Sequence, residues 1–204
     1  MNYGQLKTLV ESYAHRTDLT SLLDNFCELA EARIGRKLRA IENEHTETVT
    51  TTDEAYALSG LTYLYGSMLS IFATISGNRR PLTYYTKDQL DNLTSGISYT
   101  PYGYTIQANA LEVRPVNGNQ SLTITYFFRP TTLVGGDSNT NAILTAFPQL
   151  YIAAMLYEIA SYERDRDEQA LQLNAFNTEI MSINEQASDA RMSGGTMAAN
   201  GSIG

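Results

Sequence analysis

Cysteine, histidine and tryptophan are nearly absent from this chain of 204 residues. The single cysteine, Cys27, excludes a disulfide within the chain and is typical of a protein from a reducing compartment. The two histidines, His15 and His45, have no cysteine, histidine or carboxylate at ligand spacing, which argues against a zinc site. No run approaches the ~18 apolar residues of a membrane span, and the N-terminal residues lack the apolar segment of an export signal. We therefore expect no membrane partner.

Charge is also scarce, at 18% of the residues, and small polar residues take its place. The 14 lysine and arginine residues against 22 aspartate and glutamate residues give a net charge of −8 at pH 7. Binding to nucleic-acid phosphates needs clustered basic residues, and the one dense basic run, 31–39, lies in an expected helix. We therefore expect no tight, sequence-specific nucleic-acid binding. Such a surface is typical of a protein that is buried in an assembly, although an unusual monomer can share it.

Apolar spacing predicts two helices at the N-terminal end. Residues 3–14 and a longer segment from about 20 to 41 carry apolar side chains on one helical stripe each. Asp18 or Thr20 is the expected N-terminal cap of the longer helix, because either side chain can accept from free backbone N–H groups. Cys27 falls on the apolar stripe, which favours an inert core thiol over a nucleophile.

Two more helices are expected towards the C-terminal end. Pro148 suits a first helical position, and residues 148–164 are apolar on nearly every side, as in a buried helix. Asp165 or Asp167 can cap a last helix, whose apolar residues recur at steps of three and four. This heptad-like seam can pack within the chain or on another copy. Its residues are Leu173, Phe176, Ile180, Ile183 and Ala187.

Between the helices, β-branched residues and turn signals predict an antiparallel β region. A threonine-rich run predicts a hairpin around the turn "TTDE", and a second pair of strands flanks the turn "SGN". Thr86 and Gln89 have the spacing of a capping box, so a short helix follows. Three further strands, joined by "QAN" and "VNGN", end near Pro130.

The expected fold class is therefore α+β, with a four-helix region from the N- and C-terminal helices and an inserted antiparallel β domain. A flexible C-terminal tail completes the chain. The expected parts are residues 1–43, 44–132, 133–190 and 191–204.

No set of residues matches a known catalytic, cofactor or metal site. The run 137–141 resembles the start of a calcium loop, but Ala142 replaces the required glycine and Pro148 the bidentate glutamate. The adjacent carboxylates at 53–54 and 165–168 have structural explanations in a turn and at a helix start. We predict no catalytic residue, no cofactor and no metal. A hydrolase with carboxylates that are distant in the sequence is not excluded.

Tyrosine is abundant, with 14 residues, and several lie in the β region. Tyrosine suits protein interfaces because its apolar ring ends in a polar hydroxyl, although tyrosines can equally fill a β core. The stretch "SYTPYGY" favours an interface, since its proline and glycine indicate a loop. The residues concerned are Tyr99, Tyr102 and Tyr104.

The C-terminal segment 191–204 has too few apolar residues for a core and few charges. It cannot bury enough apolar surface to offset the conformational entropy of ordering, so we expect it not to fold alone. Glycines would let it follow a groove and its apolar side chains would fill small pockets, unless it is a terminus without a role. The residues concerned are Met192, Gly194, Gly195, Met197 and Ile203.

Several segments, in order, resemble the phage head-to-tail adaptor family, the portal-to-tail gatekeepers of short-tailed phages. They begin with the "YGQLK" helix, the "HRTDL" break and the long helix ending in "EARIGRKLR". The resemblance resumes in "NRRPLTYYTKDQLDNL", in the strand end at Tyr126, Arg129 and Pro130, and in "PQLYIAAMLYEIA". Their order over most of the chain carries the resemblance, whereas "GLTYLYGSMLS" departs from the family pattern.

The resemblance implies a structural virion protein and no enzyme. Family members form a ring, usually a dodecamer of twelve copies, under the portal; they join it to the tail nozzle and line part of the DNA exit channel. The expected partners are the portal protein, nozzle or fibre proteins, further copies, and DNA that passes without specific binding during genome ejection. The expected location is the virion neck, after assembly in the bacterial host cytoplasm.

The same resemblance implies that segment 191–204 docks on the portal. We expect the tyrosine-bearing loops of the β region to face the nozzle. Two other classes stay open: another neck, stopper or minor head protein, and a tail-associated cell-wall hydrolase.

Overall fold

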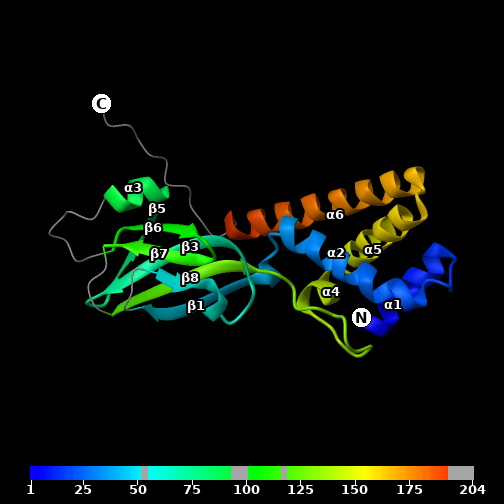
Figure 1. Cartoon of the computed structure of the whole chain (residues 1–204), viewed down its shortest axis with the longest axis horizontal. Helices are drawn as coiled ribbons and strands as arrows, with labels where there is room; N and C mark the ends of the chain where they lie inside the picture. The colour runs from blue at the N-terminus through cyan, green and yellow to red at the C-terminus, as the bar shows by residue number, and fades with distance from the viewer. Residues whose placement is uncertain (52–54, 93–100, 116–118, 193–204) are drawn as a thin grey trace. The chain divides into compact units, whose positions relative to one another are not determined.

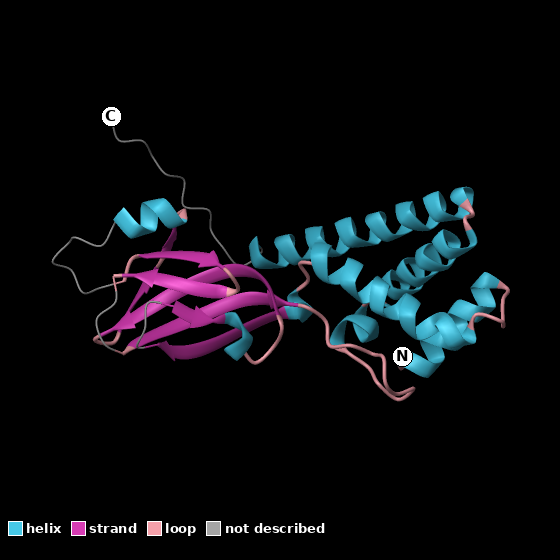
Figure 2. Cartoon of the chain, viewed as in Figure 1, coloured by secondary structure: helices cyan, strands magenta, loops and turns pink. Residues whose placement is uncertain are grey.

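The chain folds into two compact units, one helical and one of strands (Figures 1 and 2). Met1–Glu42 and the chain from Thr131 onward form the helical unit, and Asn43–Pro130 form the β unit. The β unit is thus an insertion that the chain enters and leaves once. This confirms the predicted α+β fold class, with N- and C-terminal helices in one unit. The computed structural model describes residues 1–51, 55–92, 101–115 and 119–192.

Helix α5 (Pro148–Glu163) forms the centre of the helical unit. The helices α1 (Tyr3–Ala14), α2 (Leu23–Lys37) and α6 (Arg166–Met192) each pack against it. Residues 150–156 are consequently all buried, which explains why this helix is apolar on nearly every side. Pro148 occupies the first turn, where its missing N–H costs nothing. Figure 1 shows α6 running alongside α5.

The ends of two helices follow local capping rules. At α1, the Asn2 side chain accepts from the Gln5 N–H at 2.9 Å, and the Asn2 N–H donates to the Gln5 side chain at 3.0 Å. This reciprocal pair is a capping box. At α6, the Asp165 carboxylate accepts from the N–H groups of Asp167 and Glu168, each at 3.1 Å. Asp165 is therefore the cap, as one of the two predicted alternatives stated.

The predicted cap and end of α2 were wrong. The helix begins after a short 3-10 helix, η1 (Thr20–Leu22), and no side chain caps it. Asp18 instead pairs with Arg16 at 2.6 Å, and the Thr20 hydroxyl donates to Glu11 and to the Thr17 carbonyl. The helix ends at Lys37, and Ile41 begins another 3-10 helix, η2 (Ile41–Asn43).

A short helix in the helical unit was not among the predicted elements. Helix α4 (Ala142–Ala146) follows Asn141, whose side-chain oxygen accepts from the Leu144 N–H at 2.7 Å. Five residues are too few to show a helical period, so the cap is its main sequence signal.

Within the described residues, the strands of the β unit form two four-stranded sheets. One sheet has the order β1-β8-β3-β4, with β1 (Glu44–Thr51), β8 (Gln120–Phe128), β3 (Tyr65–Ile75) and β4 (Asn78–Pro81). The other has the order β2-β7-β6-β5, with β2 (Ala55–Ala57), β7 (Ala110–Arg114), β6 (Gly103–Gln107) and β5 (Thr83–Tyr84). Neighbours are antiparallel except β5 and β6, which are parallel. The predicted short helix is α3 (Lys87–Asn92).

Both sheets contribute to one apolar core in the β unit. Leu122, Ile124 and Tyr126 of β8 are fully buried, while Thr123 and Thr125 between them are half-buried. This alternation is typical of a strand with one face on the core, and it ends at Phe127, which is buried as well.

Two hairpins were predicted correctly and one was not. The pairs β3–β4 and β6–β7 are joined by two-residue turns, at Ser76–Gly77 and Ala108–Asn109, and all four residues have positive φ. Such turns suit the right-handed twist of the strands. The "TTDE" hairpin is contradicted, because β1 pairs with β8 and β2 pairs with β7 in the other sheet.

Candidate assembly surfaces

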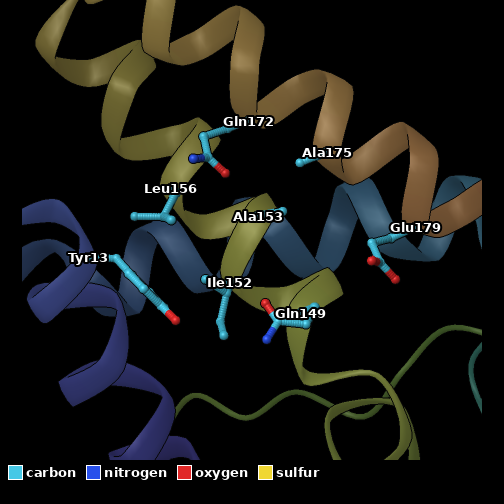
Figure 3. Close-up of a pocket in the computed structure, with 8 residues that line it drawn as sticks. All are labelled: Tyr13, Gln149, Ile152, Ala153, Leu156, Gln172, Ala175 and Glu179. Carbon is cyan, nitrogen blue, oxygen red and sulfur yellow. The ribbon is translucent and has the colours of Figure 1, made fainter.

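The helical unit carries a groove along α5, between α1 and α6 (Figure 3). Its floor is a stripe of α5 at helical spacing, with Ile152, Ala153 and Leu156, and its walls include Tyr13 of α1 and Ala175 of α6. The remaining lining residues are Gln149, Gln172 and Glu179. The groove has a volume of about 240 Å³. We call these eight residues the α5 groove.

A second hollow continues the α5 groove along the same helix. It has a volume of about 380 Å³ and shares Tyr13 and Leu156 with the groove. Three carboxylates lie along it: Glu163, Asp165 and Glu168. The floor of the α5 groove is therefore apolar, and carboxylates lie along the rim of the combined depression, where Glu163 is paired with Arg16 at 2.7 Å.

The outer side of α2 is the second surface of note in the helical unit. Leu29 is 53% exposed there, although it lies in a helix whose other large apolar residues are buried. Ala32 and Arg36 are exposed on the same stripe, at steps of three and four. Within the described ranges, Arg36 forms no ion pair or side-chain hydrogen bond. We call Leu29, Ala32 and Arg36 the α2 ridge.

The predicted seam residues of α6 lie inside the helical unit. Phe176 is fully buried, Ile180 and Ile183 are buried, and all three belong to the same core as α5. Leu173 is only half-buried.

The predicted tyrosine site divides into exposed and packed residues. Tyr102 is partly exposed, whereas Tyr104 on β6 packs against the β core, and burial raises its pKa. Tyr84 on β5 meets the Tyr104 ring edge-on, with centroids 5.6 Å apart, and is more exposed than either. Tyr99 lies outside the described residues. Tyr84 was not among the three tyrosines assigned to an interface, although Tyr85 follows it directly in the sequence.

The predicted docking tail falls almost wholly outside the described residues. Met192 is the last residue of α6 and is 60% exposed. Gly194, Gly195, Met197 and Ile203 lie beyond the part of the chain that the structure describes.

Tyr126 and Glu47 hold the start of segment 60–70, the segment that departs from the family pattern. The Tyr126 hydroxyl donates to the Glu47 carboxylate at 2.7 Å, and the Thr62 N–H and hydroxyl donate to the same carboxylate at 3.0 and 2.9 Å. Burial opposes ionisation of Glu47, but these hydrogen bonds outweigh it and lower the pKa of its carboxyl. Beside the pair, Tyr63 stacks on Phe128 with centroids 4.6 Å apart. The loop before β3 is thus held by side chains of β1 and β8.

The carboxylates that could suggest catalysis have structural partners. Glu158 binds Arg33 at 2.7 Å, and Asp165 caps α6. Glu31 accepts from the Leu133 N–H at 2.7 Å, and burial raises the pKa of its carboxyl. The predicted pair at 53–54 lies outside the described residues.

The calcium-like run forms a structural turn. Asp137 binds Lys7 at 2.5 Å, the Asn139 amide donates to the Leu133 carbonyl at 3.0 Å, and Asn141 caps α4. Across the described ranges, no group of three or more His, Cys, Asp or Glu side chains could hold a metal ion. Cys27 is buried, and burial raises its thiol pKa to about 12, as expected for an inert core residue.

No helix in the described part of the chain is long and apolar enough to cross a membrane. The surfaces described above are suited to packing against other proteins. They are the α5 groove with carboxylates on its rim, the exposed leucine and arginine of the α2 ridge, and the exposed tyrosines.

Comparison with known proteins agrees with this interpretation. The family model described as SU10 adaptor protein matches residues 1–199, which span both units. No curated protein matches the chain. Because the match covers almost the whole sequence, the predicted family resemblance is confirmed, and the chain belongs to the SU10 adaptor protein family, a family of phage head-to-tail adaptors.

Proposed function

We propose that this chain is the subunit of a closed ring of twelve copies that lies under the portal and joins it to the tail nozzle. The observation that carries the proposal is the family match over residues 1–199. Members of this family are structural proteins of the virion neck, not enzymes, and the family implies portal and tail partners. The copy number, the place of the ring and the channel are our inference.

The surfaces of the helical unit support a role in assembly. The α2 ridge leaves Leu29 exposed, and the walls of the α5 groove leave Tyr13 and Ala175 exposed, whereas the apolar floor of the groove is buried. Exposed apolar patches with a polar rim are typical of protein interfaces. We therefore infer a subunit that associates weakly in isolation and closes into a ring on the portal.

The two units of the chain have different expected partners. Segment 191–204 begins in the last turn of α6, so we assign portal docking to the helical unit and its tail, through Met192, Gly194, Gly195, Met197 and Ile203. We assign the nozzle to the β unit, whose exposed tyrosines Tyr84 and Tyr102 suit a protein contact.

DNA would pass through this ring without being bound. A net charge of −8 disfavours phosphate binding, because each phosphate contact requires a basic group to displace a counterion. An acidic channel wall lets DNA slide under pressure.

The order of assembly tests the proposal. Heads that carry the portal but lack this protein should bind it directly, and nozzle proteins should bind only afterwards. Nozzle addition to heads that lack the protein would contradict the proposal. Binding of this chain to the nozzle proteins without any binding to the portal would also contradict the proposal.

Two substitutions test this assignment of partners to units. Replacing Tyr84 and Tyr102 by serine should leave portal docking intact and reduce nozzle addition. Tyr162→Ser is the control, since Tyr162 is as exposed as Tyr84 but lies in the helical unit. If the double variant lost portal docking while remaining folded, the assignment would be reversed.

A further inference from the structure

We infer that the α5 groove of one copy receives the α2 ridge of the next copy in the ring. The inference rests on the proposed ring and names the contact between its subunits. It assigns an occupant to a groove made by residues of three helices, at positions 13, 149–156 and 172–179.

The shape of the groove suits a helix with one projecting side chain. Its walls stand on α1 and α6, and its floor is apolar (Figure 3). Ala153 and Ala175 line it, and their small side chains leave the space of about 240 Å³ open. A helix laid in an apolar groove is a common mode of protein recognition.

The ridge offers the matching features. Leu29 projects from the exposed side of α2, and the small side chain of Ala32 lets the helix backbone approach closely. Arg36 lies two helical turns from Leu29, about 10 Å along the helix axis. Leu29 would enter the groove between Leu156 and Ala175, and Arg36 would reach its rim.

One copy can use both surfaces at once. Helix α2 packs against α5, and its ridge faces away from that contact. In Figure 3, α2 lies behind α5, and the groove opens on the near side of α5. Two different surfaces on one subunit make a head-to-tail contact, which generates a ring when the rotation closes.

Charge complementarity selects the ridge over another occupant. Glu179 forms no ion pair with any residue that the structure describes, and Asp165 and Glu168 extend the acidic rim. The last turn of α2 carries Arg36 and Lys37. The alternative occupant, segment 193–204 of a neighbouring copy, contains no charged side chain and cannot match an acidic rim.

Disulfide trapping tests the contact. A chain with both Leu29→Cys and Ala175→Cys should form a ladder of cross-linked oligomers under mild oxidation, at high protein concentration and on the portal. An equimolar mixture of the two single variants should give cross-linked dimers and nothing larger. Each single variant alone should give no cross-linked species. The native Cys27 is buried and present in every variant, so the wild-type chain controls for it.

The matched control pairs Leu29→Cys with Met181→Cys. Met181 lies on the same helix as Ala175 and is more than half exposed, but it does not line the groove, so this pair should give no ladder. The absence of a ladder from the first pair, under both conditions, would overturn the inference. So would dimers of the Leu29→Cys variant alone, which would indicate a symmetric contact through α2.

Charge reversal gives a second test that does not depend on cysteine chemistry. Arg36→Glu and Glu179→Arg should each reduce oligomer formation, and the two together should restore it. Both side chains are at least partly exposed, so each variant should fold, which circular dichroism can verify. Independent losses with no restoration would contradict the pairing.

Portal docking of the wild-type chain tests the proposed function independently of the cross-linking experiment. Ring formation on the portal without cross-linking between positions 29 and 175 would refute the contact and leave the function standing. Failure of the wild-type chain to dock would refute the function, even if the ladder formed.

Discussion

Tyr126 contributes to the β unit through both its buried ring and its hydroxyl. Its ring is fully buried in the core, and its hydroxyl donates to Glu47, a carboxylate that also fixes the loop at Thr62. A buried hydroxyl needs a partner, and here the partner is charged, which strengthens the bond. One tyrosine therefore joins the core to the loop before β3.

Replacing Tyr126 with phenylalanine should lower the free energy of unfolding by about 1.5–3 kcal/mol, the usual range for a hydrogen bond to a charged group. Urea titration followed by circular dichroism measures the change. Tyr56→Phe is the control, because the Tyr56 hydroxyl donates to a neutral carbonyl, that of Gly60, at 3.0 Å. An equal loss in both variants would show that the charge of Glu47 adds nothing.

Glu31 differs from Glu47, because burial raises the pKa of the Glu31 carboxyl. Ionising it costs more in the folded chain than in the unfolded one. Its contribution to stability is therefore full below the unfolded pKa and is lost as the pH rises through the folded pKa. Glu31→Gln keeps an acceptor for the Leu133 N–H and removes the charge, so it should be more stable than the wild-type chain at pH 7.

The pH dependence of unfolding checks this interpretation of Glu31. The advantage of Glu31→Gln should shrink towards zero as the pH falls below the ordinary glutamate pKa, about 4.3. A constant advantage at every pH would indicate a packing effect instead.

At the scale of elements, the question for α6 is whether its apolar seam stabilises the fold of one subunit or the contact between copies. Phe176→Ala should cost about 3–5 kcal/mol of unfolding free energy, since the ring is fully buried against the core of α5. Leu173→Ala should cost only about 1 kcal/mol, because Leu173 is half-buried. Urea unfolding of the free chain measures both.

The reverse pattern would assign the seam to contacts between copies. In that case Phe176→Ala would leave the stability of the free chain nearly unchanged and would weaken oligomer formation on the portal.

Local patterns predicted most of the elements but not their pairing. Helical spacing located α1, α5 and α6, because each buries one stripe or nearly all of its surface. The threonine-rich strands were recognised, yet β1 pairs with β8, from the far end of the β unit. Such pairing depends on contacts distant in the sequence, which a local pattern does not contain.

The candidate surfaces were harder to predict than the fold. The α5 groove joins Tyr13, Leu156 and Ala175 from three helices, and the sequence pattern marks Leu156 only as core. One signal was available for the ridge: Leu29 is an apolar residue off the apolar stripe of its helix. A large apolar side chain out of phase with its helix indicates a surface kept for a partner.

At the scale of the whole molecule, the C-terminal tail should contribute to docking and not to folding. Helix α6 extends to Met192, so a truncation after Met192 preserves every described element. The truncated chain should keep the melting temperature of the full chain and bind the portal more weakly. Sedimentation with portal complexes measures the binding.

A gentler variant controls for the loss of chain length. Replacing Met197 and Ile203 by serine removes two apolar anchors, each worth about 1.5–3 kcal/mol if fully buried on the portal. Portal binding equal to that of the full chain, in both the truncation and this variant, would refute a docking role for the tail.

The central claim is that copies of this chain form a closed ring between portal and nozzle. Cryo-electron microscopy of the portal bound to this protein tests it most directly, without any variant. We predict a continuous ring of twelve copies on the tail side of the portal, with the β units available to the nozzle. Isolated copies on the portal without contact between neighbours, or density on another part of the particle, would contradict the account.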